Sequence, residues 1–449
     1  MSRRSILLLI LMVGMPIFSL VPKYFIIHHL YTSEDLIFED LAFGAYLDGL
    51  VHSDRFIECR PLPFAACSAG TCAHATRMPV VPLLLAEISK FVGTHTVPVA
   101  IVKVVLTALL SCLFLAILSL DLRFSSWRLV LLYGLYFGPQ ALKHAASIGY
   151  EDSVFIDLML CFGIAVSYLL RTDLTSSDIR RNIMAGAAVA LACLMYFSKP
   201  TVLPLLMVTV ALSLASRHIS WTCKAASVLL VAVPMALWAS HTLNTTGTIR
   251  LSTSYNGENL FRGYNSSSLL IYPQVNLDRV LDSSTVTLMD GTVVSIKDTA
   301  HQDCFTDEWA WNDHYAAAAH TWLWQQPVAA LKFLAIKAWV ALIEVRYTPG
   351  DRTISAAVAA IAVAWMIFAR CVFFGLLIAL AIDIFHKRYS PALWGLALMA
   401  TAFAPFVIVF AYQRHVVPLL ILAGTLLITL YARRPHEGQQ SASHGLLPA

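Results

Sequence analysis

Seven carboxylates stand close together directly after the first apolar stretch of the chain. They are Glu34, Asp35, Glu39, Asp40, Asp48, Asp54 and Glu58. This density is unusual in a chain of which only 13% of the residues are charged. If residues 35–48 form a helix, Asp35 and Glu39 share one of its faces. The stretch then fits either a solvated amphipathic helix on a membrane or a carboxylate site that faces water at the bilayer edge.

Cations stand at the ends of later apolar runs. Arg77 precedes Pro79 and Pro82, Lys199 lies in a Ser-Lys-Pro turn, and Arg414 opens the last run. Each side chain could anchor a helix end at the interface. Ionisable groups at such positions also indicate functional sites. The three cations therefore predict one pocket for an anion on the outer side of the membrane.

Glu151 and Asp152 open another apolar run. Carboxylates are favourable in the first turn of a helix, so both fit simple caps. They could instead complete a site together with Asp35. Hard oxygen ligands suit Mg²⁺ or Mn²⁺, so Asp35, Glu151 and Asp152 are also the candidate ligands of a divalent metal.

A polar block at 243–328 is rich in aromatic and amide side chains. Sugars stack on aromatic rings and hydrogen-bond to amides, so this block suits a sugar site. Trp322 and Trp324 fit an aromatic belt at the membrane interface better. The candidate sugar or acceptor contacts are Asn259, Tyr264, Asn265, Trp311 and His314.

The elements that must position these residues are membrane helices. The chain has 449 residues, of which 58% are hydrophobic, and a mean hydropathy of +0.70. It therefore predicts an all-α polytopic membrane protein. No cluster of Lys and Arg indicates nucleic-acid binding. Apolar runs of spanning length follow the first one at 98–120, 128–147, 151–170, 182–197, 201–215, 225–242, 354–385, 391–412 and 415–431.

Basic residues alternate between the ends of these runs, and the positive-inside rule assigns them to the cytoplasm. The hydrophilic blocks 28–97 and 243–328 then share the outer side, and ten helices span. In this arrangement 329–345 is an amphipathic helix in the outer interface. The alternative splits 354–385 at Arg370 into a hairpin and gives twelve spans.

The chain accordingly divides into six segments. These are an uncleaved first transmembrane helix at 1–27, an outer loop with the carboxylates at 28–97, helices 2–7 at 98–242, a large outer loop at 243–353, C-terminal helices at 354–432 and a disordered cytoplasmic tail at 433–449.

Four of the nine cysteines lie in the outer blocks. Cys59, Cys67, Cys72 and Cys304 allow three pairings in an oxidising compartment. The sequence does not choose among the pairings, although the short Cys59–Cys72 loop is expected to close on itself at least once. The other five cysteines lie in or next to apolar runs, where a free cysteine behaves as a small hydrophobic residue.

In their order and sidedness these motifs resemble the membrane glycosyltransferases of the GT-C fold that use polyprenyl-phosphate sugars, such as the bacterial aminoarabinose and mannosyl transferases. The matching residues are Asp35 before a Tyr/Ala-rich helix that ends at Gly49, Arg77 to Ala86, Glu151 or Asp152, Ser198-Lys199-Pro200, Gly257 to Tyr264, Gln326-Pro327 and Arg414. Glu39 replaces the usual aromatic residue four after the Asp, Lys199 replaces the usual Arg, and Tyr264 precedes Asn265 in the large loop.

The resemblance implies a GT-C-like bundle of about ten, or twelve, transmembrane helices. It implies an inverting transferase that moves a sugar from a polyprenyl-phosphate donor to a lipid, glycan or protein acceptor. Asp35 would be the base, with Glu39, Glu151 and Asp152 as the other catalytic candidates. The donor phosphate would bind Arg77, Lys199, Arg262 and Arg414. No cofactor is certain, and Mg²⁺ or Mn²⁺ is the candidate metal.

Two other classes of membrane protein are the alternatives to a transferase. A secondary transporter would carry broken helices and charges near the bilayer midplane, and Arg370 is the main example of such a charge. A structural membrane protein would need no clustered outer charges. The composition favours a bacterial inner membrane, whereas the sequons at Asn244 and Asn265 would suit the endoplasmic reticulum as the alternative.

Overall fold

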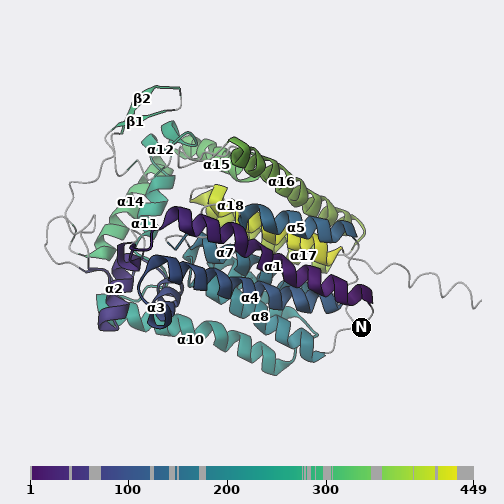
Figure 1. Cartoon of the computed structure of the whole chain (residues 1–449). Helices are drawn as coiled ribbons and strands as arrows, with labels where there is room; N and C mark the ends of the chain where they lie inside the picture. The colour runs from purple at the N-terminus through teal and green to yellow at the C-terminus, as the bar shows by residue number, and fades with distance from the viewer. Residues whose placement is uncertain are drawn as a thin grey trace, which may run out of the picture.

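The computed structural model is almost entirely helical (Figure 1). It describes residues 3–39, 43–59, 72–121, 126–140, 147–148, 151–170, 178–275, 277, 280, 285–288, 290–296, 305, 307–344, 356–387, 389–409 and 413–431.

Within these residues seven helices are long and apolar enough to cross a membrane. They are α1 (Arg3–Leu30), α4 (Thr96–Asp121), α7 (Asp152–Leu170), α8 (Asp178–Tyr196), α10 (Trp221–Thr246), α16 (Ala356–Phe385) and α17 (Tyr389–Ile408). Shorter helices α5 (Ser126–Gln140), α9 (Leu203–Ala215) and α18 (Gln413–Leu430) lie among them. The prediction of a polytopic membrane protein is confirmed.

Helix α7 forms the centre of the bundle, because every one of its residues is buried. It packs against α4, α8 and α18 (Figure 1). Gly163 allows α18 to approach closely, since a Cβ atom there would lie 2.9 Å from the side chain of Thr425. Asp152, the first residue of α7, and Glu151 just before it are therefore held by a helix that is buried along its whole length.

Smaller elements gather at one end of the bundle, opposite the N-terminus (Figure 1). They comprise η1 (Ile37–Glu39), α2 (Gly44–Ser53), α3 (Val80–Val92), η3 (Pro200–Val202), α11 (Asn256–Gly263), α12 (Ser266–Ile271), the antiparallel strands β1 (Thr285–Thr287) and β2 (Val293–Ser295), α14 (Glu308–Gln325) and α15 (Pro327–Leu342). The two hydrophilic blocks touch here, because Glu308 accepts a hydrogen bond from the backbone of Ala75. They therefore lie on the same side of the bundle, as the basic-residue pattern predicts.

Two possibilities that the sequence left open are not found in the structure. A continuous helix over 35–48 does not form: η1 and α2 are separate, because Leu36 pairs with His95 and the carbonyl of Asp35 accepts from the amide of Thr96. The hairpin at Arg370 does not form either. Helix α16 runs unbroken through that residue, and the Arg370 guanidinium donates to the carbonyls of Met366 and Val340.

Lys337 joins α11 and α15 to the end of α17. Its ammonium is fully buried and donates to the carbonyls of Gly263, Ile408 and Val409 at 3.2, 2.7 and 3.0 Å. It also lies 3.7 Å from the ring centre of Tyr264. The cation thus satisfies carbonyls at the end of a helix, where the backbone has no acceptor partners of its own.

We expect Lys337→Met to lower the free energy of unfolding by about 1–3 kcal/mol, because it leaves buried carbonyls without a donor. Lys332→Met is the matched control, since Lys332 lies exposed on the same helix. Thermal unfolding of both variants in detergent measures the effect. An equal loss in the two variants would contradict this role of Lys337.

Candidate functional site

The candidate site is built around the segment 72–77, called here the Arg77 loop. A disulfide between Cys59 and Cys72 closes the chain before it, as expected for this loop. Next to the disulfide, Glu58 and Ala73 exchange two backbone hydrogen bonds of 2.8 Å. Cys67 and Cys304 lie outside the described residues. The loop is thus fixed covalently and by backbone pairing.

Buried side chains hold the Arg77 loop from both sides. The Tyr46 hydroxyl accepts from the amide of Thr76 at 3.0 Å, and the Thr76 hydroxyl donates to the carboxylate of Glu58. On the other side Glu308 accepts from the amides of His74 and Ala75, each at 3.1 Å. Burial raises the pKa of the Glu308 carboxyl, although these hydrogen bonds favour its ionised form.

Two cations meet the two carboxylates at the start of α7. Arg77 lies 3.8 Å from Glu151, and Lys199 lies 3.0 Å from Asp152. The segments that carry the cations touch, because the amide of Val80 donates to the carbonyl of Phe197. The structure therefore brings together four predicted site residues from three separate parts of the chain, and we call this group the cation cluster.

Aromatic rings support both cations. Arg77 lies over Tyr255 at 5.1 Å, and Lys199 lies over Phe406 at 5.5 Å from the ring centre. Burial opposes the charge of Arg77, but Glu151 and its other neighbours raise its pKa above the usual value. Arg77 stays charged at any physiological pH, and its side chain is 32% exposed. It can therefore meet a ligand.

Two polar atoms in this region lack a partner within the described residues. They are the buried Nε of Arg77 and the buried hydroxyl oxygen of Thr201, two residues after Lys199. Buried polar atoms in folded proteins are almost always hydrogen-bonded, so each such orphan needs an explanation. Both can donate a proton, which suits an anion with several oxygen atoms. Sequence reasoning missed Thr201.

The structure says less about the other two predicted phosphate ligands, Arg262 and Arg414. The side chain of Arg414 lies outside what the structure describes, but the next residue, His415, stacks near Phe406, the ring under Lys199. The start of α18 is therefore close to the cation cluster. Arg262 makes an ion pair with Glu258 in its own helix α11.

Asp35 and Glu39 lie on the loop between α1 and α2. Both carboxylate oxygens of Asp35 accept from Thr32, one from its amide at 2.7 Å and one from its hydroxyl at 2.9 Å. In the described part of the chain no ion pair involves Asp35, and Glu39 is exposed. The structure links this loop to the cation cluster through Phe43, whose ring lies 5.9 Å from Arg77. It records no contact between Asp35 and the cluster.

The predicted sugar contacts differ in accessibility. Tyr264, Asn265 and Trp311 are buried. Asn265 caps α12 and donates to the carbonyl of Phe261, so its amide is already used within the fold. His314 is exposed and Asn259 is half-buried. Only these last two are accessible from solvent among the five predicted contacts.

The candidate metal ligands do not form a three-residue cluster. Among the described residues no group of three or more His, Cys, Asp or Glu side chains could hold a metal ion. Asp152 and Glu151 each face a cation instead. A divalent metal at this place would need oxygen atoms from a bound phosphate as well.

An apolar cavity of about 550 Å³ lies beside the cation cluster. Helices α3, α8 and α10 enclose it, and its lining includes Pro79, Val80 and Phe197. Leu83, Leu194 and Leu237 also line it and are 42%, 43% and 67% exposed, so the cavity opens toward the exposed apolar surface of α3, α8 and α10. Arg77 and Lys199 each stand two residues from a lining residue. The two cations therefore stand on segments that also contribute residues to the cavity lining.

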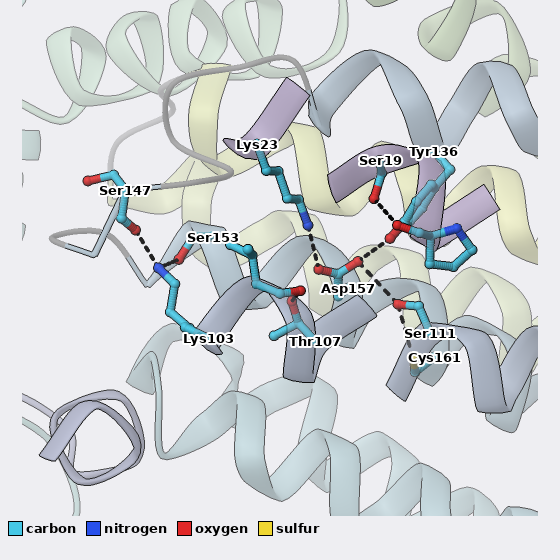
Figure 2. A network of polar contacts seen from close by, with 12 residues as sticks. Ser19, Lys23, Lys103, Thr107, Ser111, Tyr136, Ser147, Ser153, Asp157 and Cys161 are labelled. Carbon is cyan, nitrogen blue, oxygen red and sulfur yellow. Dashed lines mark hydrogen bonds and ion pairs between the residues drawn. The ribbon is translucent and has the colours of Figure 1, made fainter. Parts of the chain in front are cut away.

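A second polar group lies inside the membrane bundle (Figure 2). Lys23 of α1 and Asp157 of α7 form a fully buried ion pair of 3.1 Å. Tyr136 and Ser111 donate to the same carboxylate at 2.6 and 3.1 Å. Nearby, Lys103 donates to the hydroxyl of Ser153 at 2.8 Å.

Sequence reasoning missed this network, although single ionisable residues inside apolar runs were a usable signal. Asp157 stands in the run at 151–170, and Lys23 stands in the first one. Their pairing across 134 residues leaves no local pattern. The network joins α1, α4, α5 and α7, so it fixes the helix that carries Glu151 and Asp152.

No family model, curated protein or solved structure matches the chain.

We expect Lys23→Met to destabilise the protein by about 3–5 kcal/mol, because it leaves the Asp157 carboxylate buried and unpaired. The double variant Lys23→Met/Asp157→Leu removes both charges and should regain most of that loss. Thermal unfolding in detergent measures both. A double variant as unstable as the single one would show that the ion pair is not what Lys23 contributes.

Proposed function

We propose that the protein is an inverting glycosyltransferase that takes a sugar from a polyprenyl-phosphate donor at the outer face of the membrane. One observation carries the proposal. The two cations and the two orphan hydrogen-bond donors stand on the chain segments that also supply Pro79, Val80 and Phe197 to the lining of an apolar cavity. A lipid-linked phosphate has the same two parts, an apolar chain and an anionic head.

In this proposal Arg77, Lys199 and Thr201 bind the phosphate. An acceptor hydroxyl attacks the anomeric carbon, the bond between that carbon and the phosphate oxygen breaks, and polyprenyl phosphate leaves with the bonding electrons. The cations stabilise the negative charge that develops on the leaving oxygen. The acceptor proton must pass to a base.

Asp35 is the proposed base because of its surroundings. Glu151 and Asp152 are each already engaged by a cation. Asp35 is half-buried and makes no ion pair within the described residues. Glu39 is the second choice. The acceptor would be a lipid, glycan or protein, for which Asn259 and His314 remain accessible contacts.

We further propose ten spanning helices, formed by the seven long ones together with α5, α9 and α18. Helix α15 then lies in the outer interface. A bacterial inner membrane is the proposed location, and a divalent metal would act only together with the donor phosphate.

A secondary transporter is the second candidate, and the buried Lys23–Asp157 pair favours it. Ionisable pairs inside membranes often mark ion or proton pathways. Here, however, both side chains are fully buried and hydrogen-bonded to the surrounding helices. This arrangement suits helix packing better than a water-filled pathway. Transfer of labelled sugar from a polyprenyl-phosphate donor distinguishes the two candidates.

Thr201→Val should weaken binding of polyprenyl phosphate by about 10- to 150-fold, the equivalent of one hydrogen bond to a charged group. The change leaves both ion pairs of the cation cluster intact. Thr209→Val is the matched control, because the Thr209 hydroxyl already donates to the carbonyl of Leu205 in its own helix. Binding to the purified protein measures the effect, and equal affinity in both variants would contradict a phosphate at Thr201.

Asp35→Asn should lower turnover by about 10²- to 10⁴-fold, since it keeps the size of the side chain and removes its basicity. Binding of the donor should persist, because the cation cluster is separate from Asp35. Steady-state transfer and donor binding are measured together. Near-normal turnover would move the role of the base to Glu39 or Glu151.

A further inference from the structure

A second cavity lies at the other end of the bundle. Its volume is about 320 Å³, and it forms where α7 and α9 end and where α17 begins. Helix α7 runs from the cation cluster at Asp152 to this cavity at Leu170, a length of about 27 Å at 1.5 Å per residue. This is close to the thickness of the hydrocarbon core of a bilayer. The cavity therefore lies at the opposite membrane interface.

The lining of this second cavity, called here the inner cavity, contains positive charge, hydroxyl groups and apolar side chains. Arg217 and His218 follow the last turn of α9, and Ser390 stands in the first turn of α17. Arg217 and His218 are exposed, and no ion pair within the described residues involves Arg217. Leu169 and Leu212 provide the apolar part.

These groups are complementary to a phosphate attached to an apolar chain. Arginine forms strong, charge-assisted hydrogen bonds to phosphate oxygens. The N-terminal end of α17 adds a favourable partial charge for an anion. Trp394, a half-buried lining residue, has the amphipathic ring that is common at the level of lipid head groups.

We propose that the inner cavity binds the phosphate head group of an anionic phospholipid of the inner leaflet. Basic pockets between membrane helices on the cytoplasmic side are suited to such head groups. The inner cavity shares no lining residue with the apolar cavity between α3, α8 and α10, and it contains no residue of the cation cluster. The proposal therefore stands whether or not the protein transfers a sugar.

Native mass spectrometry of the full chain in neutral detergent tests the proposal with phosphatidylglycerol, phosphatidylcholine and glycerol phosphate as probes. Phosphatidylglycerol should bind more tightly than the other two. Arg217→Gln should weaken its binding by roughly 10-fold or more, the equivalent of a lost charge-assisted hydrogen bond. Lys224→Gln is the control of equal charge, because Lys224 lies at the same end of the bundle but outside the cavity and against Trp221.

A second variant fills the cavity without removing a charge. Ser390→Trp should reduce binding of phosphatidylglycerol as Arg217→Gln does, while an unchanged unfolding temperature shows that the fold persists. Equal binding of the two phospholipids, or an equal loss in Lys224→Gln, would overturn the proposal. Glycerol phosphate that binds as tightly as phosphatidylglycerol would show a soluble phosphate as the ligand and would overturn the lipid assignment.

Discussion

The end of the bundle opposite the N-terminus depends on the Arg77 loop being held between two buried carboxylates. Glu58 binds Thr76 from one side, and Glu308 binds the amides of His74 and Ala75 from the other. Both carboxylates are almost fully buried, where an unsatisfied charge would be costly. Hydrogen bonds to the loop meet that requirement for both oxygens of Glu308 and for one oxygen of Glu58. The same hydrogen bonds fix the backbone of the loop directly before Arg77.

The spanning helices were readable from the sequence, because the length of an apolar run is set by the membrane itself. The run at 151–170 corresponds to α7 (Asp152–Leu170), and the run at 225–242 lies within α10 (Trp221–Thr246). The outer loops were harder to predict. Asp35 and Glu39 have helical spacing, but pairing of Leu36 with His95 decides the local conformation. That contact depends on the packing of distant segments.

The candidate site was likewise predictable from the sequence only in part. Arg77, Lys199, Glu151 and Asp152 were identifiable, because ionisable groups where an apolar run begins or ends are candidates for function. Their pairing was not predictable, because it depends on how three loops meet. Asn265 shows the opposite case. Its sequence context suggests a contact to a sugar, but its side chain caps α12 and is buried. Composition alone cannot separate a binding amide from a capping one.

The contact between Ala75 and Glu308 also has a consequence for biosynthesis. The two residues are 233 positions apart. At about 5–20 residues per second, a ribosome needs roughly 10–50 s between them. Throughout that interval the Arg77 loop lacks one of its two carboxylates, and several helices must still enter the membrane. The Cys59–Cys72 disulfide needs only residues already made. The disulfide can hold the loop closed until Glu308 has been synthesised and can bind the loop.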